Sequence, residues 1–422
     1  MPDLCYDCVV IYFQSLTRDE LADLLLPFSA RPRDRHVDAD GTPLVELNDA
    51  PSLPEIKRAR MRAKQIYHWV YQRFVTDWDQ MTDLNKEVRG WLKENVEIFR
   101  LSERHAQQAT DGTHKFLWNL PDHKTIESVI IPAALQEKDK MENDGKVFRG
   151  RPSEEELDSQ HWSRLTACIS SQVGCAMACK FCLTGIQGLD RSLAVHEIVT
   201  QVFELRKQAP ITNIVFMGMG EPLHNVDNVI KACKILLDED GMNFSKRKVT
   251  VSTSGLVPAI EQLGQSVDVS LAISLNATTD EVRSKIMPVN KKWNIEKLME
   301  TCRNYPLGSH RRITFEYVLL KDVNDTMEDA ARLLKLVRGI PNKINLIPFN
   351  EHSGSEFLRP SDETVRKFQR YLVDRGLTAT VRISRGQDIL AACGQLRSIF
   401  GTARGSDRHK DWAGLKGMAG TS

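Results

Sequence analysis

The sequence has no hydrophobic run of the kind that crosses a membrane or directs secretion. A membrane-spanning helix needs about 20 mainly apolar residues, and no stretch of the 422-residue sequence approaches that length. The apolar run 9–13 is short and follows Asp3 and Asp7, whereas a signal peptide carries basic residues at that place. These absences predict a cytoplasmic protein without a membrane segment.

The sequence also lacks a strong net charge and an even number of cysteines. Lys and Arg total 57 against 56 Asp and Glu, a net charge of +1, so a polyanion would have to bind a local basic patch. The nine cysteines are an odd number in a long chain, which argues against a disulfide framework. They are expected to be thiols used for metal binding, catalysis or packing. Cys233 and Cys302 fall in helical patterns that predict burial.

The pattern of the sequence changes near residue 164. Before it, residues 17–100 have helical periodicity, with Thr17 and Glu20 at capping-box spacing. Residues 113–132 predict a hairpin around Asp122 and His123 that feeds an extra strand. The expected divisions are an N-terminal extension (1–16), a helical accessory domain (17–100), a β extension (101–133), a charged insertion (134–163), an α/β domain (164–405) and a C-terminal tail (406–422).

After residue 164, runs rich in Val, Ile and Thr alternate with amphipathic helical segments. Repeated β–α units of this kind need right-handed crossovers and form a parallel sheet. Roughly six units are present, fewer than the eight of a closed barrel. The fold class we expect is therefore α/β, a partial (β/α)6 TIM-like barrel with a small helical accessory domain and a short β extension.

The unusual peptides of this region follow its predicted strands. Parallel α/β sheets present ligand-binding residues at the carboxyl ends of their strands. We therefore expect one site at that edge of the sheet. The peptides are the cysteine run 175–182, Gly218–Glu221, Ser252, Ser274–Asn276, Asn350 and Cys393.

Cys175, Cys179 and Cys182 form a C-x-x-x-C-x-x-C run with no fourth cysteine or histidine at a suitable spacing. A structural zinc site needs four ligands. A [4Fe–4S] cluster held by three thiolates has one iron without a protein ligand, where another molecule can bind. Three cysteines brought together by chance, or redox-active thiols, are the alternatives.

The peptide CAMACKFC (175–182) resembles the signature of radical S-adenosylmethionine (SAM) enzymes, in which SAM binds the open iron and is cleaved when the cluster is reduced. Further blocks are similar to the RlmN-type family, which methylates C2 of adenosine in 23S ribosomal RNA and in tRNA. They are CISSQVGCAMACKFCLTGIQGL, FMGMGEPL, SKRKVTVSTSGLVPAI, LAISLNAT, NLIPFN and GQDILAACGQLRS. The resemblance covers about residues 55 to 400.

This resemblance implies a role for individual residues. Cys175, Cys179 and Cys182 would hold one [4Fe–4S] cluster, and two SAM molecules would be used per turnover. Cys393 would carry the methyl group as S-methylcysteine, Cys168 would form a transient disulfide with it, and Glu127 would accept a proton. The implied SAM contacts are Gly220, Glu221, Ser252, Ser274, Leu275, Asn276 and Asn350.

The sequence departs from the family in two places: Asn276 stands where the family commonly has His, and the insertion 134–163 is longer than the usual connector. Taken without the resemblance, Cys168 is equally a buried thiol, Cys393 a packed small residue and Glu127 an exposed strand residue.

The implied partners are 23S rRNA and tRNA, with a flavodoxin-type reductase system as electron donor and a monomeric enzyme. Two basic clusters are expected to contact phosphates, and the target base would have to leave its stack to reach a barrel mouth. The clusters are Lys57, Arg58, Arg60, Arg62 and Lys64, and Lys246, Arg247 and Lys248.

Two other function classes remain open at this point. A radical SAM enzyme that acts on C8 of adenosine or on another substrate, such as a peptide, would cleave SAM without forming 2-methyladenosine. A non-enzymatic, metal-stabilised RNA-binding protein would contain zinc, be colourless and leave SAM intact.

Overall fold

The computed structural model describes residues 10–29, 51–133, 164–352, 355–382, 384–392 and 394–396. Cys393, the charged insertion 134–163 and the C-terminal tail 406–422 lie outside the described residues.

The centre of the fold is one ten-stranded sheet with the strand order β14-β13-β12-β11-β10-β9-β6-β5-β4-β3. The strands from β6 to β14 are parallel, and β5, β4 and β3 continue the sheet in antiparallel pairs. Because β14 and β3 end the sheet without pairing to each other, the barrel is open, as predicted. The strands are β3 (Ser102–Gln108), β4 (His114–Asn119), β5 (Thr125–Pro132), β6 (Leu165–Cys168), β9 (Asn213–Phe216), β10 (Val249–Thr253), β11 (Ser270–Ser274), β12 (Ile313–Leu319), β13 (Asn342–Pro348) and β14 (Ala379–Val381).

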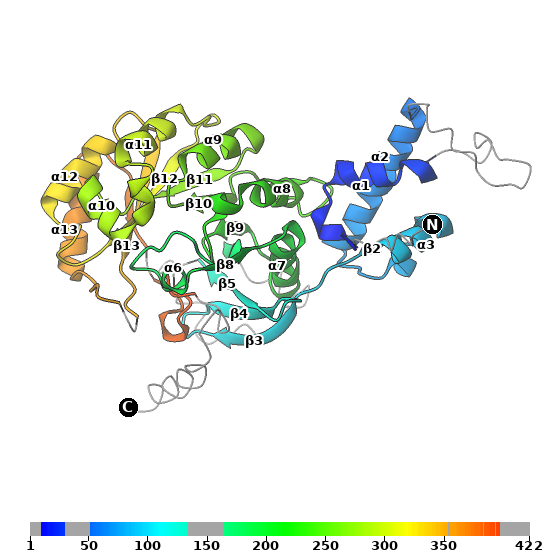
Figure 1. Ribbon diagram of the computed structural model, residues 1–422, viewed down its shortest axis with the longest axis horizontal. Helices are drawn as coiled ribbons and strands as arrows, with labels where there is room; N and C mark the ends of the chain where they lie inside the picture. The colour runs from blue at the N-terminus through cyan, green and yellow to red at the C-terminus, as the bar shows by residue number, and fades with distance from the viewer. Residues whose placement is uncertain are drawn as a thin grey trace, which may run out of the picture.

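Helices connect the parallel strands and lie outside the sheet (Figure 1). In the described ranges, no helix combines the length and apolar character that a membrane crossing requires. The connecting helices are α7 (Val195–Gln208), α8 (Val226–Leu237), α9 (Val257–Ser266), α10 (Asp280–Ile286), α11 (Ile295–Asn304), α12 (Met327–Leu336) and α13 (Asp362–Val373).

The strand register gives the parallel sheet a polar inner face and an apolar outer face. Ser252 pairs with Ala272, and Ser274 pairs with Glu316. Since side chains alternate along a strand, these residues share one face. The residues between them are buried under the helices. They include Val249, Val251, Leu271, Ile273, Ile313 and Phe315.

The expected hairpin is present as β4 and β5, with His123 in the left-handed region (φ 63°). β5 then pairs antiparallel with β6, and Val129 lies opposite Cys168. Because β5 runs against the parallel strands, its amino-terminal half lies beside their carboxyl ends. The hairpin therefore adds side chains to the edge of the sheet where a ligand site is expected.

A helical module packs on the outside of the sheet, beside α7 and α8 (Figure 1). Thr17 caps α1 through the capping box that the sequence predicts. Buried aromatic side chains form the module's core, and Tyr71 extends this core to Phe203 of α7. The ion pair of Lys231 with Glu20 (2.7 Å) also joins the module to α8. Its elements are β1 (Ile11–Tyr12), α1 (Arg18–Leu24), α2 (Leu53–Tyr67), the π-helical turn His68–Gln72, α3 (Lys86–Asn95) and β2 (Val96–Glu97).

Candidate active site

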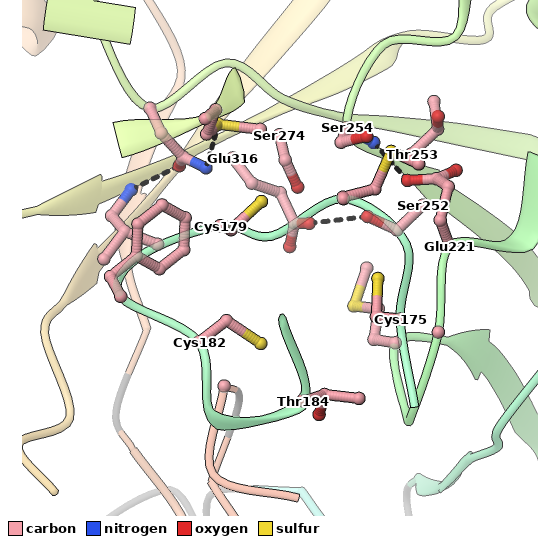
Figure 2. A pocket seen from close by; sticks show the side chains of 18 of the residues that line it. Cys175, Cys179, Cys182, Thr184, Glu221, Ser252, Thr253, Ser254, Ser274 and Glu316 are labelled. Atoms are coloured by element: carbon pink, nitrogen blue, oxygen red, sulfur yellow. Dashed lines mark hydrogen bonds between the residues drawn. The ribbon is translucent and has the colours of Figure 1, made fainter. Parts of the chain in front are cut away.

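A cavity opens at the carboxyl ends of the parallel strands (Figure 2). It contains about 980 Å3 that no protein atom occupies, part of it open to solvent. Five of the six peptides that the sequence analysis expects at one edge of the sheet meet there, and the sixth, Cys393, lies outside the described residues. The predicted residues that line this cavity are Cys175, Cys179, Cys182, Gly220, Glu221, Ser252, Ser274, Asn276 and Asn350.

The three cysteines lie between β7 (Gln172–Gly174) and α6 (Leu183–Gln187), and their side chains surround one space (Figure 2). The backbone N–H of Cys175 donates to Gly188 O (2.9 Å), and that of Cys182 donates to Cys179 O (3.1 Å). In the described part of the chain, no three His, Cys, Asp or Glu side chains are arranged to hold a single metal ion. Thiolates that bind a [4Fe–4S] cluster each take a different iron, so three cysteine side chains around one space fit the donor set of such a cluster.

Burial makes these thiols poor acids without a metal. It raises the pKa of Cys175 to about 12, and it also raises the pKa of Cys179 and of Cys182. Metal ligation requires thiolates and releases their protons. The loop therefore presents a neutral, apolar cage that becomes charged only when it binds metal.

Gly185 lets α6 approach the cysteine loop. A Cβ at this position would lie 2.9 Å from both the backbone N and O of Cys179, so Gly185→Ala must displace the backbone of a predicted ligand. We expect this overpacking to cost about 1 to 3 kcal/mol and to lower the iron and sulfide retained per chain after anaerobic reconstitution. Gly90→Ala is the control, because nothing lies within 4 Å of a Cβ there. Equal iron content in the two variants would contradict this account of the loop.

The Gly220-Glu221 peptide forms a tight, buried turn after β9. Gly220 has φ +100°, and a Cβ there would lie 2.5 Å from the Gln172 side chain. The Glu221 carboxylate accepts from the backbone N–H groups of Leu223 (3.0 Å) and Ser254 (2.7 Å). Burial nevertheless raises the pKa of Glu221. The turn thereby joins the ends of β9 and β10 at the cavity wall.

Ser252 donates its hydroxyl hydrogen to Glu316 (2.9 Å; Figure 2). Glu316 lines the same cavity and is only 5% exposed, but the sequence analysis did not select it. A lone Glu inside the apolar strand sequence ITFEYVL was the available signal, since an acidic residue is rarely buried without a partner. The carboxylate is suited to accept a hydrogen bond from a hydroxyl or amino group of a ligand.

Ser274 and Asn276 line the cavity, whereas Leu275 is buried in the core. Asn276 has φ 57°, a conformation in which Asn and His are both enriched. Its side-chain oxygen accepts from Val318 N (2.8 Å) and its amide donates to Met287 Sδ (3.2 Å). The side chain thus holds the strand end, and the backbone oxygen of Asn276 accepts from Asn324 Nδ2 (2.7 Å).

Arg283 is a second residue that the sequence analysis missed. It is fully buried, and burial lowers the pKa of its guanidinium to about 10. It donates to Ser254 O (2.6 Å), Ser274 O (3.2 Å) and Leu275 O (2.9 Å). One cation thus fixes the ends of β10 and β11. A lone Arg in a short amphipathic helix gives little sequence signal for such a role.

Cys168 and Glu127 do not line the cavity, but they share its face of the sheet. Cys168 pairs with Val215 and Val215 pairs with Thr250, two residues before Ser252, so Cys168 lies on the polar inner face. Glu127 is two residues from Val129, the partner of Cys168. Both Cys168 and Glu127 are nearly inaccessible to solvent.

Glu127 is also tied to the chain that leads to Cys393. Its carboxylate pairs with Lys115 Nζ (3.2 Å), and the same ammonium donates to Leu390 O (3.4 Å). On the other side of Cys393, Gly394 and Leu396 line the cavity. Gly394 O accepts from Leu183 N (2.8 Å), directly after Cys182.

The two predicted basic clusters lie in different surroundings in the structure. Within α2, Arg58 and Arg62 donate to backbone carbonyls of 28–29, and Lys64 pairs with Asp240 (2.8 Å). Lys57 and Arg60 remain exposed. Residues 246–248 are exposed too, but they precede β10 and therefore lie at the opposite end of the sheet from the cavity.

Comparison with known proteins gives matches over most of the chain. The profile of the Radical SAM superfamily matches residues 169–334, and that of the Ribosomal RNA large subunit methyltransferase N-terminal domain matches residues 53–98. The dual-specificity RNA methyltransferase RlmN of Geobacter sulfurreducens is 51% identical over 81% of this chain and 87% of its own length. That of Syntrophotalea carbinolica is 48% identical over 86% and 91%. A crystal structure of a radical SAM methyltransferase from Sphaerobacter thermophilus is 38% identical, with a TM-score of 0.71 over 92% of this chain and 99% of that one.

Proposed function

Because the chain belongs to the RlmN family of radical SAM methyltransferases, we propose that it methylates C2 of adenosine in 23S rRNA and tRNA. It is a radical SAM enzyme that methylates RNA; the target carbon and the residue roles below are the proposal. The observation that supports it most is the cavity in which three cysteines face the polar ends of β9, β10, β11 and β13, with Gly394 in the same wall.

The [4Fe–4S] cluster would be held by Cys175, Cys179 and Cys182. The donor set fits, since three thiols face one cavity and a fourth protein ligand is not needed when SAM binds the remaining iron. The peptides at Gly220, Ser252, Ser274 and Asn350 would contact SAM. When bound, the cluster and SAM would supply a carbon radical and accept the electron that is lost later.

C2 of adenine lies between two ring nitrogens and is too electron-poor to attack a sulfonium methyl group. A cysteine thiolate, in contrast, can attack the sulfonium methyl group. In this proposal the Cys393 sulfur bonds to the methyl group of one SAM as the sulfonium C–S bond breaks. The methyl group on Cys393 would then give a hydrogen atom to the carbon radical supplied by the cluster and the second SAM, and its own carbon, now a radical, would bond to C2.

Two further residues complete the reaction. Glu127 accepts the proton lost from C2, and its ion pair with Lys115 (3.2 Å) fixes the position of the carboxylate. The Cys168 thiolate would then attack the sulfur of Cys393. The bond between that sulfur and the methylene carbon breaks, and the carbon takes up a proton to become the methyl group of the released RNA, which leaves a disulfide between the two cysteines. A thiol reductant must reduce this disulfide before the next turnover.

The proposal includes the partners that this chemistry requires. The RNA substrates are 23S rRNA and tRNA, and a flavodoxin-type system supplies electrons to a monomeric, cytoplasmic enzyme. Lys57 and Arg60 are the exposed members of the α2 cluster that form no ion pair with the described residues, and they are therefore the ones suited to contact phosphates.

The experiment is nucleoside mass spectrometry of unmodified tRNA and 23S rRNA fragments after incubation with the reconstituted chain, SAM and a reductant. We expect 2-methyladenosine in RNA and 5′-deoxyadenosine in solution. If 8-methyladenosine forms instead, or if SAM is cleaved without RNA methylation, the assignment to C2 is wrong.

A further inference from the structure

A second cavity lies beside the active site, between α13 and the chain that follows β14. We call it the arginine pocket. Four of its residues recur on one face of α13 at helical spacing, and the rest come from the ends of β13 and β14 and the segments after them. It is lined by Pro348, Arg359, Asp362, Val365, Arg366, Gln369, Val381, Arg382, Ser384 and Gln387.

The arginine pocket carries a net positive charge. Its lining includes three arginines and one acidic residue, Asp362. Asp362 accepts from Arg359 (3.3 Å), but its side chain is 69% exposed, so water screens this pair strongly. In the described ranges, no ion pair engages Arg366, which is exposed on α13.

A hydroxyl group in the pocket also needs a partner. The Ser384 Oγ atom is buried, and among the described residues nothing forms a hydrogen bond with it. A buried hydroxyl without a partner costs free energy. Guanidinium groups with a hydroxyl donor are the groups that bind phosphate oxygens in proteins.

The pocket and the active-site cavity share a wall. Ile347 and Phe349 line the cavity, whereas Pro348 between them lines the pocket, as expected when side chains alternate along a strand. Gln387 Nε2 in the pocket donates to Asn350 Oδ1 in the cavity (3.1 Å). The arginine pocket and the active-site cavity therefore lie on opposite faces of the end of β13 and are linked by this hydrogen bond.

We propose that the arginine pocket binds a backbone phosphate of the RNA next to the adenosine in the cavity. This inference rests on the proposed function, since it takes RNA to be the substrate. The phosphate would accept from Arg359, Arg366 and Ser384 and would hold the strand while the base leaves its stack. Phosphate contacts position a nucleic acid without reading its sequence, so the pocket would serve both RNA substrates.

The test is the salt dependence of RNA binding by the full reconstituted chain. An unmodified tRNA transcript is the probe, and Arg366→Gln and Arg359→Gln are compared with Arg370→Gln, an exposed residue of α13 outside the pocket. Each lost phosphate contact should reduce the slope of log K against log salt by about 0.7 to 0.9. With 1 M salt as reference, this is about a tenfold loss of affinity at 50 mM salt and about fivefold at 150 mM.

The control variant decides between the pocket and general surface charge. The inference holds if Arg366→Gln and Arg359→Gln lower the slope and Arg370→Gln does not. It is overturned if all three variants bind like the unmodified chain, or if all three lose the same affinity. If the pocket variants bind normally while the unmodified chain still forms 2-methyladenosine, only this inference fails. If the pocket variants lose binding but no 2-methyladenosine ever forms, the proposed function fails and the phosphate site remains.

Discussion

The Cys393→Ala variant is expected to form no 2-methyladenosine while it still binds a [4Fe–4S] cluster. Without the sulfur there is no atom to carry the methyl group, and SAM cannot methylate C2 directly because this carbon is a poor nucleophile. Removal of a covalent nucleophile lowers a rate by about a thousandfold or more. Nucleoside mass spectrometry of RNA from a strain that lacks its own enzyme, complemented with the variant, measures the effect.

Iron content and a matched cysteine variant separate this effect from a folding defect. Cys393→Ala should retain the iron of the unmodified chain, because the predicted cluster ligands are Cys175, Cys179 and Cys182. Cys5→Ala, at a cysteine without an assigned role, should methylate normally. If Cys393→Ala still produces 2-methyladenosine, Cys393 does not carry the methyl group.

The Cys168→Ala variant is expected to become covalently attached to its RNA substrate. In the proposed reaction, the methylene carbon joins Cys393 to C2 before Cys168 attacks, so loss of Cys168 stops the reaction at the joined state. Cys168 lies on the inner face of the sheet, on the strand next to that of Glu127. This position is consistent with access to the intermediate. A denaturing gel with labelled RNA should show a band of protein and RNA that nuclease treatment removes.

The double variant Cys168→Ala, Cys393→Ala controls for adventitious cross-linking, and it should form no such band. Release of free methylated RNA by Cys168→Ala at the normal rate would show that another group resolves the intermediate. A band that persists in the double variant would show that the attachment is not to Cys393.

Local sequence patterns predict most of the fold and the members of the cavity. The alternation of Ser252, Ala272 and Ser274 with apolar neighbours identifies strands with one polar face, and the carboxyl-end rule for parallel sheets then brings distant peptides together. The amphipathic helical segments predicted after residue 164 are present too, among them α7 (Val195–Gln208). Periodicity is a local property of the sequence, because apolar residues that recur at a fixed spacing share one face of a helix or strand and are buried together.

Contacts between distant residues could not be predicted in the same way. The charge pattern of α2 is visible in the sequence, but not that Arg58 and Arg62 donate to backbone carbonyls of a neighbouring segment. The pairing of Glu316 with Ser252 and the bonds of Arg283 to two strand ends likewise depend on tertiary arrangement. A single charged residue gives the same local signal on a surface and in a core.

The central claim is that three thiolates hold an iron–sulfur cluster with one iron free to bind and cleave SAM. The most direct measurement is the iron, sulfide and zinc content of the chain purified without oxygen, followed by reduction with dithionite in the presence of SAM. We predict about four iron and four sulfide per chain and conversion of SAM to 5′-deoxyadenosine and methionine. A colourless protein that contains zinc, or a reduced iron centre that leaves SAM intact, would contradict the account.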